Sequence, residues 1–212
     1  GKKIHFSSRT DKQIKKLYEK DFKSEILLNN LDNLKISYLS SEFTTVRYGP
    51  FRDVHPLIYL NWQKELFSWL REKTGNLTQV KLHPKRKTRL YDPEEDINIT
   101  NDKNKIFEDT DVIVLDYPTT SFAHAAASSK PLLFFDIGLR NMSENALKII
   151  KNRFYYSKTN ILNPKPGLDL MLSDLGRKCS NEYTETFSKS PNIGSEIEIT
   201  KECIIENIVQ RR

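Results

Sequence analysis

Residues 112–121 read Val112-Ile113-Val114-Leu115-Asp116-Tyr117-Pro118-Thr119-Thr120-Ser121, and this segment indicates the fold more clearly than any other. Its first four residues are apolar, as in strands that are buried on both faces of a parallel sheet. Pro118 cannot donate a backbone hydrogen bond, which suits the entry to a helix. Small residues follow, and the alanines among them favour a helix over 119–129 that packs closely on the sheet. The segment therefore predicts a strand, a turn and a helix in succession.

Apolar runs alternate with amphipathic segments on both sides of it. Strands are predicted at 35–39, 77–82, 96–100, 131–135 and 154–156. Helices are predicted at 57–73, 104–109, 143–152 with Ser143 as N-cap, 168–179 and 201–211, and a charged helix-like segment at 11–29. In the helix at 57–73, apolar spacing is seen at Leu57, Leu60, Phe67 and Leu70. Strands separated by helices indicate an α/β fold, a Rossmann-like parallel sheet with helices on both faces.

The length fits one such domain with flanking segments. The chain has 212 residues, of which 37% are hydrophobic, so it can bury a substantial core. We expect residues 1–34 to be a helical linker or the remnant of a preceding domain, 35–160 the Rossmann-like domain, and 161–212 a C-terminal helical extension. The chain begins with Gly1 rather than Met, so we expect it to be a piece of a longer protein.

Composition disfavours several classes of protein. No apolar run approaches the roughly 20 residues that span a bilayer, and the first residues do not form a signal peptide. Two cysteines, Cys179 and Cys203, are too few for a disulfide framework or a cysteine-based zinc site. We expect both to be reduced in a cytoplasmic protein.

Positive charge gathers in one segment, residues 81–89 (KLHPKRKTR), within a chain of formal net charge +6. This segment is either a solvated loop or a contact for anions, including the lipid at the inner face of the membrane. Nucleic acid is disfavoured as a partner, because the basic residues lack the interleaved aromatics of a single-strand platform apart from Tyr91.

Three hydroxyl residues, Thr119, Thr120 and Ser121, follow the apolar strand. In open α/β sheets, ligands bind beyond the carboxyl ends of the strands. The start of a helix offers unbonded N–H groups and a favourable dipole to a phosphate. The plain alternative for each hydroxyl is an ordinary N-cap without a ligand. We predict a phosphate-binding turn here.

Other candidates stand near the ends of predicted strands. His83 precedes Pro84 and is kept extended, so its imidazole could contact a phosphate or stabilise a leaving group, as Lys85 could; the alternative is an ordinary strand-end histidine. For the nucleoside we select Asp116, Tyr117, Asp136 and Glu144, the last as an acceptor for a ribose hydroxyl. No glycine-rich dinucleotide fingerprint or Walker loop is present, and we expect neither a metal nor a cofactor.

Three segments together resemble a known family. They are residues 80–84, ending in His83-Pro84, residues 106–121, and residues 130–136, which read Lys130-Pro131-Leu132-Leu133-Phe134-Phe135-Asp136. They are similar to the C-terminal, donor-binding half of GT-B glycosyltransferases, above all the CDP-glycerol glycerophosphotransferases and related bacterial surface-carbohydrate transferases. The resemblance covers about residues 35–152.

The resemblance implies a function and a set of contacts. His83 would contact the donor phosphates, and Thr119 and Thr120 stand where the family has a serine pair. The chain departs from the family in having Pro118-Thr119-Thr120 in place of Ser-Ser-hydrophobic, so the pair could fall in either of two registers. The family uses a nucleotide-activated sugar or polyol-phosphate donor, a glycan or lipid-linked acceptor and no metal. It also has an N-terminal acceptor domain, which we expect this chain to lack or to hold only as a remnant.

Two other functions fit the same architecture. A sugar-nucleotide 2-epimerase shares the phosphate turn and would need acid and base carboxylates in a companion domain. A non-catalytic binding module would keep the fold without the chemistry, because fold does not fix function.

Overall fold

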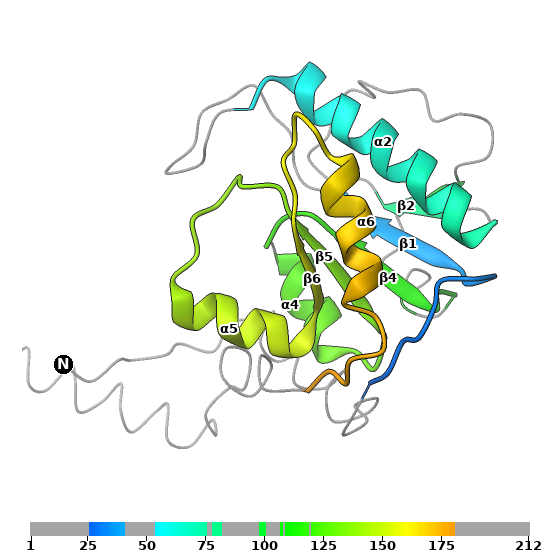
Figure 1. The fold of residues 1–212 in the computed structure, drawn as a ribbon. Helices are drawn as coiled ribbons and strands as arrows, with labels where there is room; N and C mark the ends of the chain where they lie inside the picture. The colour runs from blue at the N-terminus through cyan, green and yellow to red at the C-terminus, as the bar shows by residue number, and fades with distance from the viewer. Residues whose placement is uncertain are drawn as a thin grey trace, which may run out of the picture.

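A computed structural model describes residues 26–40, 54–75, 78–81, 98–100, 107, 109–118 and 120–180. Within them lie the strands β1 (Ile36–Leu39), β2 (Thr78–Lys81), β3 (Asn98–Thr100), β4 (Val112–Leu115), β5 (Leu132–Asp136) and β6 (Tyr155–Lys158). The helices are α2 (Pro56–Thr74), α4 (Thr120–Ala127), α5 (Glu144–Arg153) and α6 (Lys165–Ser173) (Figure 1). Within the described residues, strands and helices alternate from β1 to β2 and from β4 to α6, as the sequence predicts.

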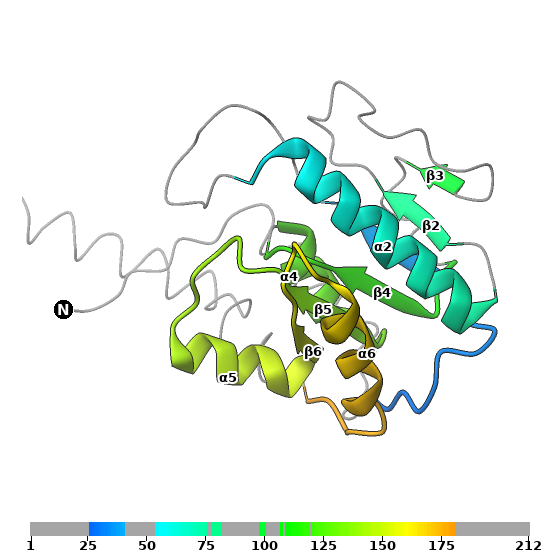
Figure 2. The ribbon, with the colours of Figure 1, turned by 45° about the horizontal axis from the view of Figure 1, so that its top comes forward.

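These strands form one parallel sheet in the order β3-β2-β1-β4-β5-β6 (Figure 2). This is the strand order of a Rossmann fold. From β1 the chain builds β2 and β3 on one side, and it then returns to place β4 on the other side of β1. The predicted Rossmann-like α/β sheet is therefore confirmed. The strand order reverses between β1 and β4, and this place is the switch point of the sheet.

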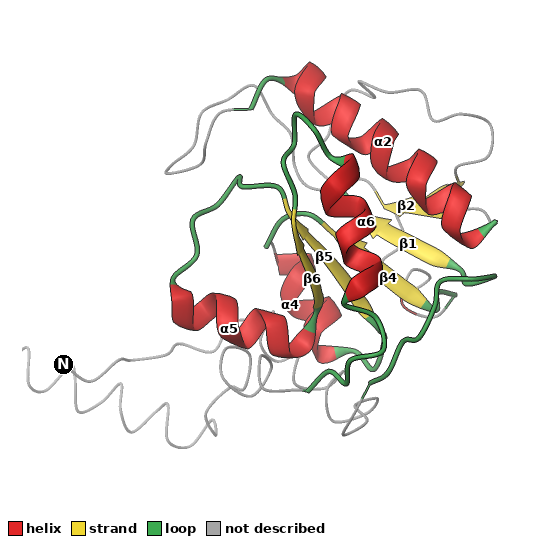
Figure 3. Cartoon of the chain, viewed as in Figure 1, coloured by secondary structure: helices red, strands yellow, loops and turns green. Residues whose placement is uncertain are grey.

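Helices cover both faces of the sheet. Side chains of α2 and α6 join Val114 and Phe135 in one buried cluster. Side chains of α4 and α5 join Ile113 and Phe134 in another. Successive residues of β4 and β5 thus point to opposite faces and are buried on both, which explains their unbroken apolar runs. Figure 3 shows α2 and α6 together on one side of the strands and α4 partly hidden behind them.

Local signals set the helix ends. The predicted N-cap of α5 is confirmed, because the Ser143 side chain accepts a hydrogen bond from the N–H of Ala146 at 3.3 Å. At the start of α2, Nδ1 of His55 accepts from the N–H of Leu57 at 3.3 Å. The same helix ends at Gly75, whose φ of 63° is the left-handed conformation that favours glycine.

Two predicted helices differ from the structure. The helix expected at 168–179 begins at Lys165, because prolines are tolerated in a first turn, and ends at Ser173. The chain then turns at Gly176, which has a φ of 82°. The end of the segment expected to be helical at 11–29 is extended instead, because Ile26 forms an antiparallel bridge with Cys179. Residues 11–25, the helix at 201–211 and most of 104–109 lie outside the described residues.

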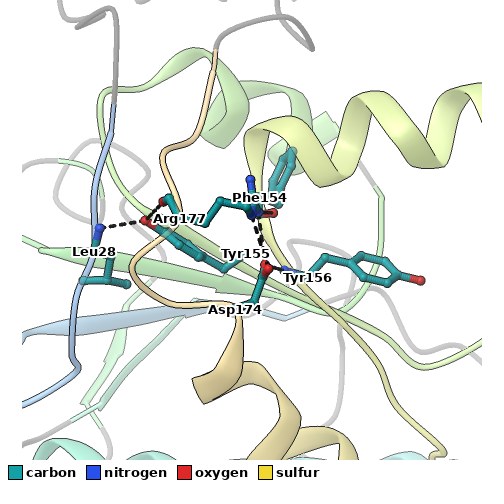
Figure 4. Close-up of polar contacts among 6 residues, drawn as sticks. All are labelled: Leu28, Phe154, Tyr155, Tyr156, Asp174 and Arg177. Carbon is teal, nitrogen blue, oxygen red and sulfur yellow. Dashed lines mark hydrogen bonds and ion pairs between the residues drawn. The ribbon is translucent and has the colours of Figure 1, made fainter.

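Hydrogen bonds and an ion pair connect both flanking segments to the start of β6 (Figure 4). We call the four residues that make them, Leu28, Tyr155, Asp174 and Arg177, the clasp. The Tyr155 hydroxyl accepts from the N–H of Leu28 at 2.6 Å and donates to the carbonyl of Arg177 at 2.9 Å. Asp174 pairs with Arg177 at 3.0 Å. Residues on both sides of the predicted domain boundaries, 34/35 and 160/161, share one buried cluster with α2. The clasp lies at the amino edge of the sheet, because β6 begins at Tyr155.

Candidate functional site at the carboxyl edge of the sheet

Parallel strands bring their carboxyl ends to one edge of the sheet. Ligands of open α/β sheets bind at this edge, at the point where the strand order reverses. Here the strands on either side of that point are β1 and β4, whose last residues Leu39 and Leu115 are partners in the sheet. The β4–α4 turn, residues 116–121, starts directly at the switch point. The topology of the sheet therefore places this turn where a ligand is expected to bind.

The β4–α4 turn passes from the interior to the surface. Asp116 is 2% exposed, whereas Tyr117, Pro118 and Ser121 are partly exposed. Because α4 begins at Thr120, the turn leads into the end of a helix whose dipole favours an anion. Thr119 and the side chain of Thr120 lie outside the described residues.

The Asp116 carboxylate is the centre of a buried hydrogen-bond network. Its Oδ2 accepts from the hydroxyl of Tyr38 at 2.5 Å, from the hydroxyl of Tyr59 at 2.8 Å and from Nε1 of Trp62 at 2.9 Å. Gln63 Nε2 in turn donates to the Tyr38 hydroxyl at 3.1 Å. Tyr38 lies on β1 and the other donors on α2. One oxygen thus joins β1, α2 and β4 beneath the switch point.

This network offsets the cost of burying a carboxylate. An isolated buried charge is expensive, but hydrogen bonds to a charged group are stronger than those between neutral groups. Burial, and then the Asp116 carboxylate, raise the pKa of Tyr38 well above its ordinary value. The Tyr38 hydroxyl therefore stays protonated at neutral pH and remains a donor.

Asp136 ends β5 and holds the loop that follows it, the β5–α5 loop (residues 137–143). Its Oδ1 accepts from the N–H of Gly138 at 3.1 Å, and its Oδ2 accepts from the Tyr156 hydroxyl at 2.8 Å. Gly138 has a φ of 76°, which turns the chain in a way that favours glycine. The loop then presents Arg140, whose Nη1 donates to the carbonyl of Pro118 at 3.4 Å. The β5–α5 loop and the β4–α4 turn are therefore in contact.

Arg140 adds positive charge to the rim of the turn. Its side chain is exposed, and it lies close enough to Tyr117 to act on it: partial burial raises the pKa of Tyr117, and the Arg140 charge opposes that rise. A guanidinium presents several donors in a planar fork that matches phosphate and carboxylate oxygens. The rim is therefore suited to an anion.

The chain matches no protein-family model, no curated protein and no solved structure. The resemblance to the GT-B transferases consequently depends on the three quoted segments alone. In the described part of the chain, no helix is long and apolar enough to cross a membrane. The same residues contain no group of three or more His, Cys, Asp or Glu side chains that could hold a metal ion.

The structure brings together only some of the predicted site residues. Asp116 and Tyr117 belong to the β4–α4 turn. Asp136 bonds to Gly138 of the β5–α5 loop, and that loop contacts the β4–α4 turn through Arg140. Glu144 is exposed in the first turn of α5. His83 and Lys85 lie outside the described residues, so their contacts with a phosphate stay predictions. Contacts of Tyr117, Asp136 and Glu144 with a nucleoside stay predictions as well, and so does that of Asp116, which is 2% exposed and would have to make it through its backbone.

Sequence reasoning missed Arg140 and the donors to Asp116. Arg140 could have been suspected, because a glycine two residues after a buried strand is typical of a sharp turn that sends the chain back over the sheet. No comparable signal marks Tyr38, Tyr59 or Trp62. Each of them lies inside a regular element, and the local sequence does not show that its polar atom bonds to Asp116.

Proposed function

We propose that this chain is the donor-binding domain of a GT-B-type transferase, one that takes a nucleotide-activated sugar or polyol phosphate without a metal. In the proposed reaction an acceptor hydroxyl forms a bond to the transferred group and loses its proton to a general base. With a sugar donor the bond from the anomeric carbon to a nucleoside diphosphate breaks, and with a polyol-phosphate donor the bond from phosphorus to a nucleoside monophosphate breaks. The acceptor would be a glycan or a lipid-linked acceptor used in building the bacterial surface. We propose that the protein works in the cytoplasm, at the inner face of the membrane.

One observation carries the proposal: the β4–α4 turn begins at the switch point of a parallel sheet and receives an arginine from the neighbouring loop. In sheets of this order, nucleotides bind at the switch point with their phosphates at a helix start. The Pro118 carbonyl holds the exposed guanidinium of Arg140 beside the turn. Nucleotide binding alone does not specify a reaction. The transferase class is proposed from the sequence resemblance of residues 80–84, 106–121 and 130–136 to the GT-B family.

The proposed chemistry needs stabilisation of charge on the leaving phosphate. Donors that are fixed before the reaction stabilise such charge without reorganising during it. We assign this role to the backbone N–H groups at the start of α4, to the hydroxyls of Thr119, Thr120 and Ser121, and to Arg140. His83 and Lys85 are proposed to contact the phosphates from the segment after β2.

The direct test replaces two of the hydroxyls. In the double variant Thr119→Ala with Thr120→Ala, we expect nucleotide affinity to fall by about tenfold or more, because two hydrogen bonds to a charged phosphate are lost. Alanine suits a helix start well enough to leave the fold intact, apart from about 1 kcal/mol if one hydroxyl is an N-cap. Affinity is measured by titration calorimetry with CMP, CDP, UDP and GDP. Equal affinities in the variant and the parent would refute the phosphate turn.

Removal of the rim charge gives a second test. We expect Arg140→Gln to weaken nucleotide diphosphate binding about fivefold to twentyfold, through loss of one charge-assisted contact. Lys148→Gln is the matched control, because it removes one exposed positive charge from the nearby helix α5. The same calorimetric titrations are run at low and at physiological salt. If both variants weaken binding equally, only the net charge of the protein matters and Arg140 makes no specific contact.

A further inference from the structure

We propose that Asp116 is a positioning residue, whose carboxylate, held by Tyr38, Tyr59 and Trp62, fixes the β4–α4 turn in the conformation that binds the nucleotide phosphates. This inference rests on the proposed function and adds to it a residue that acts through the turn. The carboxylate itself is buried, so it acts on the ligand through the backbone that follows it.

Asp116 occupies the position in the chain at which the turn leaves the sheet. It is the residue that directly follows β4, and two residues later the carbonyl of Pro118 receives Arg140. Anchoring the side chain of Asp116 therefore fixes the direction in which the turn leaves the sheet. The same anchor sets where the Pro118 carbonyl, and hence the Arg140 guanidinium, is held.

Hydrogen bonds to a charged group, rather than apolar contacts, hold the Asp116 side chain. An apolar side chain of similar size would fill the same space without the desolvation cost of a buried carboxylate. Hydrogen bonds to a charged group are directional as well as strong. Three donors on one oxygen, from two separate elements, thus orient the Asp116 side chain where apolar packing would only fill space.

Helix α2 supplies two of the three donors to Asp116. The helix begins beside His55, at the carboxyl edge, and its residues Tyr59 and Trp62 reach Asp116 within its first two turns. Because the Trp62 indole donates to Asp116, we expect an anion bound at the adjoining β4–α4 turn to change the electrostatic surroundings of the indole N–H. This gives the proposal a spectroscopic signature that a merely structural role would not produce.

The mutational test compares two buried tyrosine hydroxyls. Tyr59→Phe removes one donor to Asp116, and Tyr155→Phe removes the hydroxyl of the clasp at the opposite edge of the sheet. Both variants keep the aromatic ring and should fold. We expect Tyr59→Phe to weaken binding of CDP or UDP about fivefold or more, and Tyr155→Phe to leave that affinity within about twofold. Calorimetry on the full chain measures both.

The spectroscopic test uses the two tryptophans of the chain, which both lie on α2. Trp62 donates to Asp116, whereas Trp69 donates to Asp169 of α6 at 3.3 Å, away from the turn. In ¹H–¹⁵N spectra recorded during titration with CDP or UDP, we expect the Trp62 indole signal to shift and the Trp69 signal to stay. Assignment comes from a Trp69→Phe variant.

The outcomes separate this inference from the proposed function. Nucleotide binding with an unmoved Trp62 signal, or with an unchanged affinity in Tyr59→Phe, would overturn the positioning role and leave the proposed function standing. Failure of the unmodified chain to bind CMP, CDP, UDP or GDP would overturn the proposed function, and the inference with it.

Discussion

Replacing Asp116 by alanine is expected to lower the free energy of unfolding by about 3 kcal/mol. In the variant, the hydroxyls of Tyr38 and Tyr59, which are 2.9 Å apart, can still bond to each other. One hydroxyl hydrogen and the N–H of Trp62 lose their acceptor, and each unsatisfied buried donor costs about 1–3 kcal/mol. Relief from burying a charge offsets part of that sum. Urea denaturation at pH 7, followed by circular dichroism, measures the loss.

Asp111→Ala is the control for this prediction. Asp111 is an exposed aspartate at the other end of β4, and it accepts one hydrogen bond, from the N–H of Lys35 at 2.9 Å. We expect its replacement to cost less than about 1 kcal/mol, because water can take the place of the carboxylate. Similar losses for the two variants would mean that the donors around Asp116 find other acceptors, and that the network is not a stabilising unit.

The strands of the sheet centre could be predicted closely, because burial on both faces leaves little choice of residue. Residues 112–115 are apolar without interruption, and β4 has these bounds. The end of β5 was predicted to within one residue for the same reason. The prediction is less accurate where a segment is only partly buried. The bounds of α6 depend on two prolines and a glycine, and they moved by three residues or more.

Apolar spacing predicts only part of the buried face of α2: Phe67 and Leu70 are buried, as expected. Leucine spacing selects Leu57, which is 66% exposed, whereas Tyr59 and Trp62 are fully buried. Tyrosine and tryptophan each carry a polar atom that needs a partner when buried. For Trp62 that partner is Asp116, 54 residues further along the chain. Because this partner is distant in the sequence, hydropathy does not predict whether Tyr59 and Trp62 are buried or exposed.

The approach of Arg140 to the turn is also a consequence of tertiary structure. Arg140 contacts the carbonyl of a residue 22 positions before it, and it can do so because β4 and β5 are neighbours in the sheet. Strand order is not encoded in the local pattern of either segment. The sequence therefore predicted the strand-to-helix turn at this edge of the sheet, but not the cation that faces it.

Phe122→Ala is expected to lower the free energy of unfolding by about 4 kcal/mol, because the variant leaves a cavity in a closely packed core. Phe122 is fully buried, its ring stacks on Phe154 with centroids 4.2 Å apart, and Phe134 meets it edge-on at 5.0 Å. It directly follows Ser121, so it anchors the first turn of α4 to the sheet. Leu162→Ala, in the loop after β6, is the control: Leu162 is 71% exposed, and we expect a change within about 0.5 kcal/mol. Urea denaturation of both variants decides the matter. A loss for Phe122→Ala no larger than that of the control would mean that this aromatic cluster does not hold the start of α4.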